Sequence, residues 1–183
     1  MSAGQYLDEA LAQEAAGYRA ELEGRPAAAH YRAARDGYLA SHAETGPQSW
    51  GRLIGALKMA ILAGDGVELI ARQALAETAS SESPAASYAR ALAAVAVAEE
   101  PDVRAMVDAG GAFARTGEAL AALADGDRER YRSAIDAIVA DFASRDQHLS
   151  GVAVADTAMV LERLAEPRGL AARPSSPLVP LIR

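Results

Sequence analysis

Apolar residues recur three and four positions apart along most of this chain, and short polar segments interrupt the pattern. Such spacing places side chains on one face of an α-helix, so each stretch predicts an amphipathic helix. The interruptions are rich in Gly, Pro, Asp and Glu, which favour turns, and lie at 23–26, 63–66, 99–102, 125–127 and 166–169. Because short connections force neighbouring helices to run antiparallel, the chain reads as a series of helical hairpins.

Local signals place several helix ends. We expect the first helix at about 2–23, a helix from Pro84 with Ser83 as its cap, and the last helix at about 152–166. Two adjacent glycines cost about 2 kcal/mol relative to alanine inside a helix, so 110–111 predicts a break. The fold class is therefore all-α, with eight or nine helices in consecutive antiparallel hairpins. They would form one domain over 1–183, either a short α-solenoid or a compact helical array.

The segment 173–183 is expected to be an extended tail, since three prolines exclude a helix there. Its apolar residues predict an arm that lies on the helices or on a neighbouring molecule. These apolar residues are Leu178, Val179, Leu181 and Ile182.

The sequence carries a weak internal repeat at a shift of 100 residues. Tyr31 and Arg32 then align with Tyr131 and Arg132, and eight identities fall between residues 31 and 61. This register suggests a pseudo-repeat relating 1–80 to 100–170. Small and aromatic residues at helical spacing resemble positions of a tetratricopeptide-type repeat, namely Ala15, Tyr18, Ala27, Tyr31 and Ala34 with Gly24 in the turn. The resemblance implies stacked helical hairpins that bind a protein or peptide.

A second resemblance concerns the end of the chain. The segments 160–170 (VLERLAEPRGL) and 175–180 (SSPLVP) are similar to the C-terminus of bacterial immunity proteins that neutralise polymorphic toxins. That resemblance implies an inhibitor that acts by binding a toxin.

Composition supports an all-helical fold and narrows the partners. Alanine, the best helix former, supplies 46 of the 183 residues, and small residues let helices approach closely. The net charge of −7 argues against nucleic acid, whose phosphates need clustered cations. Arginine dominates the basic residues and Lys58 is the only lysine, a bias that we attribute to a GC-rich genome.

Neither a secretion signal nor a membrane span is expected. The N-terminus lacks a basic-then-apolar pattern, and the longest apolar run, 91–98, is far shorter than the roughly 20 residues that span a bilayer. We therefore expect a cytoplasmic protein.

Candidate chemistry is sparse. No cysteine is present, and the three histidines, His30, His42 and His148, show no helical ligand spacing, so we expect no cofactor, no metal and no enzyme. Asp146, His148 and Asp156 form the densest titratable group, which reads more simply as a solvated loop. Arg32 with Asp36 and Arg132 with Asp136 are spaced for ion pairs within a helix.

The leading hypothesis is a non-catalytic domain that binds a protein or peptide, which could be a second copy of this chain. The candidate binding groove comprises Tyr31, Arg32, Trp50, Tyr131, Arg132, Asp146 and His148. The two tyrosines are expected to be partly buried, with hydroxyls that reach the surface. Alternatives are a helical pocket for a small apolar ligand and an immunity-type inhibitor of a bacterial toxin.

Overall fold

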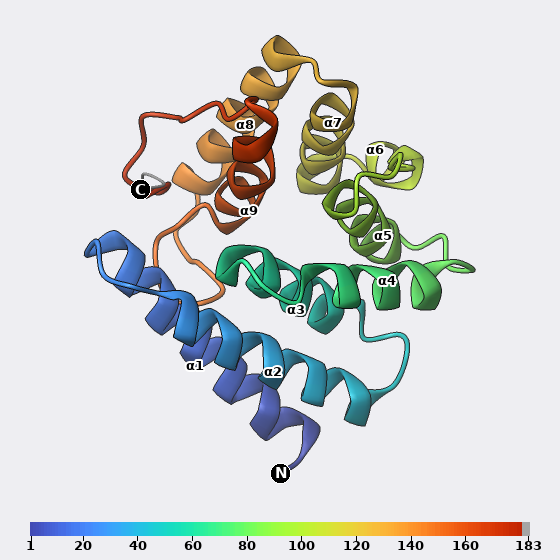
Figure 1. The fold of residues 1–183 in the computed structure, drawn as a ribbon, viewed down its shortest axis with the longest axis vertical. Helices are drawn as coiled ribbons and strands as arrows, with labels where there is room; N and C mark the ends of the chain where they lie inside the picture. The colour runs from blue at the N-terminus through green and yellow to red at the C-terminus, as the bar shows by residue number, and fades with distance from the viewer. Residues whose placement is uncertain (181–183) are drawn as a thin grey trace.

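The computed structural model describes residues 1–180, and within these residues all regular secondary structure is helical, without strands (Figure 1). This confirms the predicted all-α fold class. The helices are α1 (Ala3–Leu22), α2 (Ala28–Thr45), α3 (Trp50–Ala63), α4 (Val67–Thr78), α5 (Pro84–Ala96), α6 (Arg104–Ala109), α7 (Gly111–Asp125), α8 (Arg128–Ala143) and α9 (Asp156–Ala165), and a 3-10 turn, η1 (Glu166–Arg168), follows α9.

Most helix ends lie where the sequence signals place them. Ser2 and Gln5 form a capping box at the start of α1, and the Ser83 side chain accepts from the Ala86 N–H ahead of α5. The helix is interrupted at Gly110, which lies between α6 and α7 and has a positive φ of +71° that an α-helix does not allow. The last helix begins at Asp156, later than expected. The preceding segment is irregular instead, because Val152 and Val154 are buried there and the Ala155 N–H donates to the Leu178 carbonyl at 2.8 Å.

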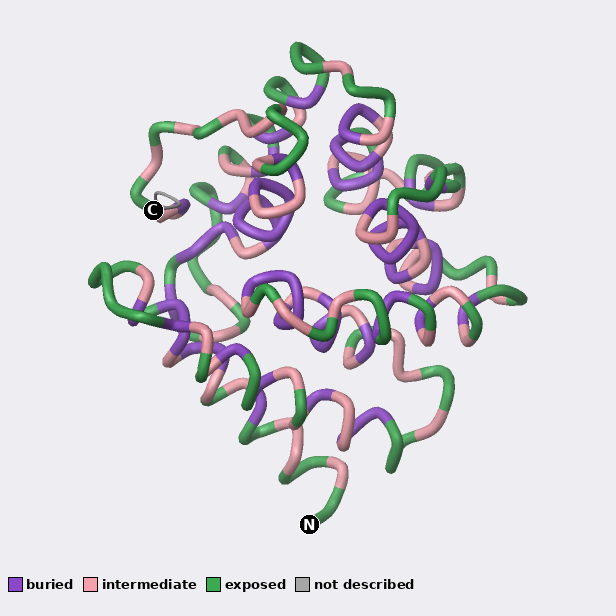
Figure 2. The backbone as a smooth tube through the Cα atoms, in the orientation of Figure 1, coloured by how far each residue is buried: buried purple, intermediate pink, exposed green. Residues whose placement is uncertain are grey.

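Consecutive helices pack against one another, and the chain then returns on itself. Figure 1 shows α1 and α2 side by side at one end, α3 and α4 across the middle, and α5 to α9 beyond them. The last helix, α9, contacts α3, α7 and α8, although α3 lies far earlier in the sequence. Buried positions concentrate on the sides of the helices that face one another (Figure 2), and nearly all buried apolar residues form one connected core.

Glycines allow tyrosine rings to lie against the backbone of a neighbouring helix. A Cβ atom at Gly17 in α1 would lie 2.4 Å from Cε1 of Tyr31 in α2, closer than two carbon atoms can approach. Gly55 in α3 has the same relation to Tyr38, at 2.9 Å. Small residues therefore set the separation between α1, α2 and α3, as the composition suggests.

The tail lies on the helices of its own chain. Val179 is buried, and the buried carboxylate of Glu162 accepts from the backbone N–H groups of Ala172 at 3.0 Å and Arg173 at 2.6 Å. The same carboxylate accepts from the Tyr131 hydroxyl at 2.9 Å. The tail is thus tied to α9 through Glu162, which α8 also contacts, while the expectations for Leu181 and Ile182 fall outside the described residues.

Candidate functional site

A pocket of about 250 Å³ opens where α1, α3, α5, α7, α8, α9 and the α8–α9 loop meet. We call it the central pocket. It combines titratable groups with aromatic walls and is open to solvent on one side. Its lining includes Glu14, Tyr18, Lys58, Tyr88, Phe113, Arg115, Asp141, Phe142, Arg145, His148 and Asp156.

The inner wall holds a buried ion pair. Nζ of Lys58 donates to Oδ2 of Asp156 at 2.7 Å and to Oγ1 of Thr157 at 3.1 Å, and the Lys58 side chain is only 12% exposed. Burial alone would lower the pKa of Lys58, but the neighbouring Asp156 carboxylate outweighs it and raises that pKa above 10.5. The pair therefore stays charged and joins α3 to the first turn of α9.

Glu14 lies beside this pair without a cation of its own. Its carboxylate is buried and accepts from the Tyr38 hydroxyl at 2.5 Å. Burial raises the pKa of Glu14 above 4.5, the hydrogen bond from Tyr38 partly offsets this, and the Asp156 carboxylate raises it further. The hydroxyl of Tyr18, also in the lining, is buried and makes no hydrogen bond of normal geometry. Buried polar groups that lack partners are uncommon and mark sites where a ligand can supply the missing contact.

Aromatic rings and arginines form the outer part of the central pocket. Tyr88 and Phe113 pack edge to face with centroids 6.5 Å apart, and the Arg145 guanidinium lies 3.7 Å from the centroid of Phe142. Asp141 accepts from both Arg115 and Arg145. The two arginine side chains are 34% and 36% exposed, against 12% for Lys58, so they lie at the mouth.

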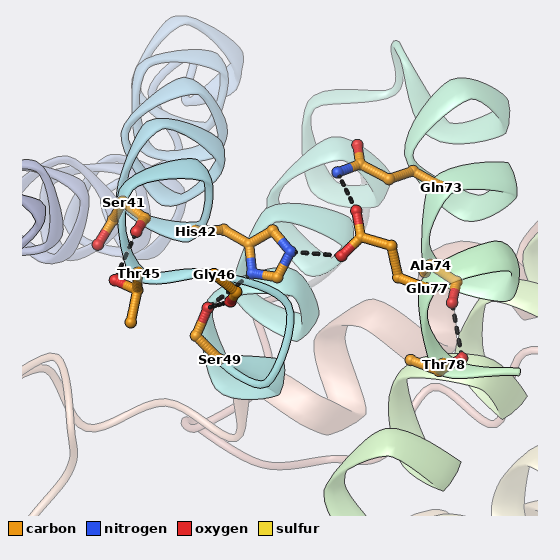
Figure 3. Close-up of polar contacts among 9 residues, drawn as sticks. All are labelled: Ser41, His42, Thr45, Gly46, Ser49, Gln73, Ala74, Glu77 and Thr78. Carbon is orange, nitrogen blue, oxygen red and sulfur yellow. Dashed lines mark hydrogen bonds and ion pairs between the residues drawn. The ribbon is translucent and has the colours of Figure 1, made fainter. Parts of the chain in front are cut away.

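A separate polar cluster fixes the loop between α2 and α3 (Figure 3). Nε2 of His42 lies 2.7 Å from Oε2 of Glu77 in α4, and Nδ1 lies 2.7 Å from Oγ of Ser49. Burial would raise the pKa of Glu77, but hydrogen bonds from His42 and Gln73 lower it below 4.5. The Ser49 hydroxyl also donates to the Gly46 carbonyl at 2.9 Å, so its one proton already has an acceptor. The cluster ties the end of α2 to α4.

The structure does not bring the predicted groove residues together. Tyr31 and Tyr131 are fully buried, and their hydroxyls do not reach the surface as expected, because one is enclosed near α1 and the other bonds to Glu162. Trp50 is half-buried at the start of α3, whereas Arg132 and Asp146 are exposed on α8 and on the loop after it. Only His148 lines the central pocket, where its ring stacks on Phe142 with centroids 6.2 Å apart.

The expected ion pair within α2 is also replaced. Arg32 pairs with Asp65 in the α3–α4 turn, and Asp36 pairs with Arg35. Asp65 accepts from Arg35 as well, so the turn after α3 supplies the carboxylate that both arginines share. Arg132 and Asp136 form no ion pair within the described part of the chain.

Sequence reasoning missed Glu14 and Lys58, the two most deeply buried charged groups of the central pocket. One signal was available: Lys58 is the only lysine, and it stands within an otherwise apolar helix, LIGALKMAILA. Because apolar residues flank Lys58 on both sides, this lysine is expected to be buried, and a buried cation needs an anionic partner.

Comparison with known protein families, curated proteins and solved structures found no match for this chain. Within residues 1–180, no three or more His, Asp and Glu side chains gather in a way that could hold a metal ion. No helix in that range combines the length and apolar character needed to cross a membrane.

Proposed function

We propose that this chain is a non-catalytic binding domain that recognises a segment of a partner protein, and that the central pocket receives the anchoring side chain of that segment. The supporting observation is a solvent-open pocket of about 250 Å³ walled by aromatic side chains and rimmed by Arg115 and Arg145. Buried aromatic residues and arginines dominate the binding energy of protein interfaces. The volume lies just below the range of about 300–1,000 Å³ that is typical of small-molecule sites.

A small apolar ligand fits this pocket less well. Glu14, Lys58 and Asp156 line its inner wall, and an apolar ligand there would offer no partner to the Glu14 carboxylate, which the Lys58–Asp156 ion pair leaves without a cation. Inhibition of a bacterial toxin is a special case of protein binding and stays a prediction. The proposed setting is the cytoplasm of a bacterium.

The test is a selection of random displayed peptides on the full-length protein. Ala112 is exposed and lines the pocket at the start of α7, so Ala112→Trp should fill the mouth. The matched control is Ala137→Trp, which changes an exposed alanine of α8 that does not line the pocket. We expect selected peptides to bind Ala112→Trp at least tenfold more weakly than the wild type or the control. A selection without enrichment, or peptides that bind Ala112→Trp normally, would contradict the proposal.

A further inference from the structure

Glu14 is a buried carboxylate that no cation of the described chain neutralises. It is 7% exposed, and no lysine, arginine or histidine nitrogen of residues 1–180 pairs with it within 4.0 Å. The nearby Lys58 ammonium is already bonded to Asp156 and Thr157. The inner wall therefore holds two carboxylates, Glu14 and Asp156, against one ammonium group. Because a desolvated charge is costly unless it is paired, this excess of negative charge suits a cationic group.

Tyr18 supplies a second observation, a buried polar atom that points to a ligand. Tyr18 is 1% exposed and lines the central pocket, and its hydroxyl makes no hydrogen bond of normal geometry, although it lies near enough to the Glu14 carboxylate for each group to shift the pKa of the other. A phenolic oxygen can accept from an N–H donor. An ammonium or guanidinium group at this point would bond both to the Glu14 carboxylate and to the Tyr18 hydroxyl.

The walls between the inner end and the mouth suit the rest of such a side chain. The ring of Tyr88 already faces one cation, Nζ of Lys58, 5.6 Å from its centroid, and Phe113 continues the aromatic surface. Aromatic faces attract cations, and the methylene groups of long basic side chains pack well against apolar surface.

The mouth carries the opposite excess of charge. Two arginines, Arg115 and Arg145, share the single carboxylate of Asp141, which leaves one positive charge in excess. An acidic group next to the basic side chain would therefore be attracted at the rim.

We propose that the central pocket binds a lysine or arginine side chain of the partner segment, with its charged end at Glu14 and Tyr18 and an acidic neighbour at Arg115 and Arg145. This inference rests on the proposed function, since it names the group that anchors the partner. It differs from a generic apolar anchor because it requires the charge of Glu14.

The test uses two capped amino acids of nearly equal length, Nα-acetyl-lysine methylamide and its uncharged norleucine counterpart. Each is titrated to millimolar concentration into the full-length protein while the amide signals of α7 and α9 are followed by NMR. We expect the lysine probe to shift signals at Phe113 and Thr157 with at least tenfold higher affinity than the norleucine probe. Glu14→Gln should abolish that preference, whereas Glu9→Gln, an exposed change in the same helix, should preserve it.

Equal binding of the two probes, or a lysine preference that survives Glu14→Gln, would overturn the inference. The displayed-peptide selection separates this failure from that of the proposed function. Pocket-dependent peptides that share an apolar residue would uphold peptide binding and refute the basic anchor. A lysine-specific probe response without any selected peptide would uphold the chemistry of the pocket and refute peptide binding.

Discussion

Replacing Lys58 by methionine should destabilise the protein by about 3 kcal/mol, because it removes one member of a buried ion pair. Methionine fills nearly the same volume but leaves the Asp156 and Glu14 carboxylates facing each other without a cation. Breaking a buried pair in this way costs roughly 3–5 kcal/mol. The low end applies, because the Asp156 side chain is 23% exposed and water can solvate part of its charge. For a chain of this size the melting temperature should fall by about 6–12 °C.

Urea unfolding at neutral pH, followed by far-UV circular dichroism, measures the free energy of unfolding of Lys58→Met, Asp156→Asn and the double variant. The double variant should recover part of the loss, because no unpaired member of the pair remains. A loss below about 0.5 kcal/mol for Lys58→Met, or strictly additive losses in the double variant, would refute the assignment of a buried, interacting pair.

Three further predictions follow from the same contacts. The raised pKa of Glu14 means that its contribution to stability is greatest below its ordinary pKa of 4.5 and is lost as the pH rises through the folded-state pKa. Glu14→Gln should therefore gain stability relative to the wild type above pH 4.5, as measured by unfolding at several pH values. A difference in unfolding free energy that does not change with pH would count against this assignment. Glu162→Ala should lower the free energy of unfolding by at least about 2 kcal/mol and accelerate hydrogen exchange at Ala172 and Arg173, because their N–H groups lose an acceptor. Unchanged exchange at these two amides would show that the carboxylate does not hold the tail. Gly17→Ala should lower the free energy of unfolding by about 1–3 kcal/mol, because the added Cβ atom clashes with Tyr31. A Cβ atom at Gly51 would meet no atom within 4 Å, so Gly51→Ala should be neutral or stabilising by up to about 1 kcal/mol. Equal denaturation midpoints of the two variants would contradict the packing argument.

The helices were predictable because their signals are local. The spacing of apolar residues, Ser83 before Pro84, and the pair of glycines at 110–111 each act within one or two turns. The start of α9 lies later than the sequence predicts, because the irregular segment before it is held by the tail through the contact of Ala155 with Leu178, 23 positions further along the chain.

The central pocket could not be predicted in the same way, because its groups come from six helices and a loop. Lys58 and Asp156 are 98 residues apart, and no spacing rule relates positions so distant. The tyrosines were assigned to a surface groove for a related reason. Whether Tyr31 is buried depends on Gly17 of the preceding helix, which lets the ring pack against α1.

The contact between α3 and α9 also governs the order in which a nascent chain can complete its core. At a synthesis rate of about 5–20 residues per second, the ribosome adds Asp156 roughly 5–20 s after Lys58. During that interval the earlier helices can pack together, but Lys58 lacks its Asp156 partner. The apolar side of α3 that α9 will cover also stays exposed to water. A chain that stops before residue 156 should therefore expose apolar surface of α3 that the longer chain covers with α9.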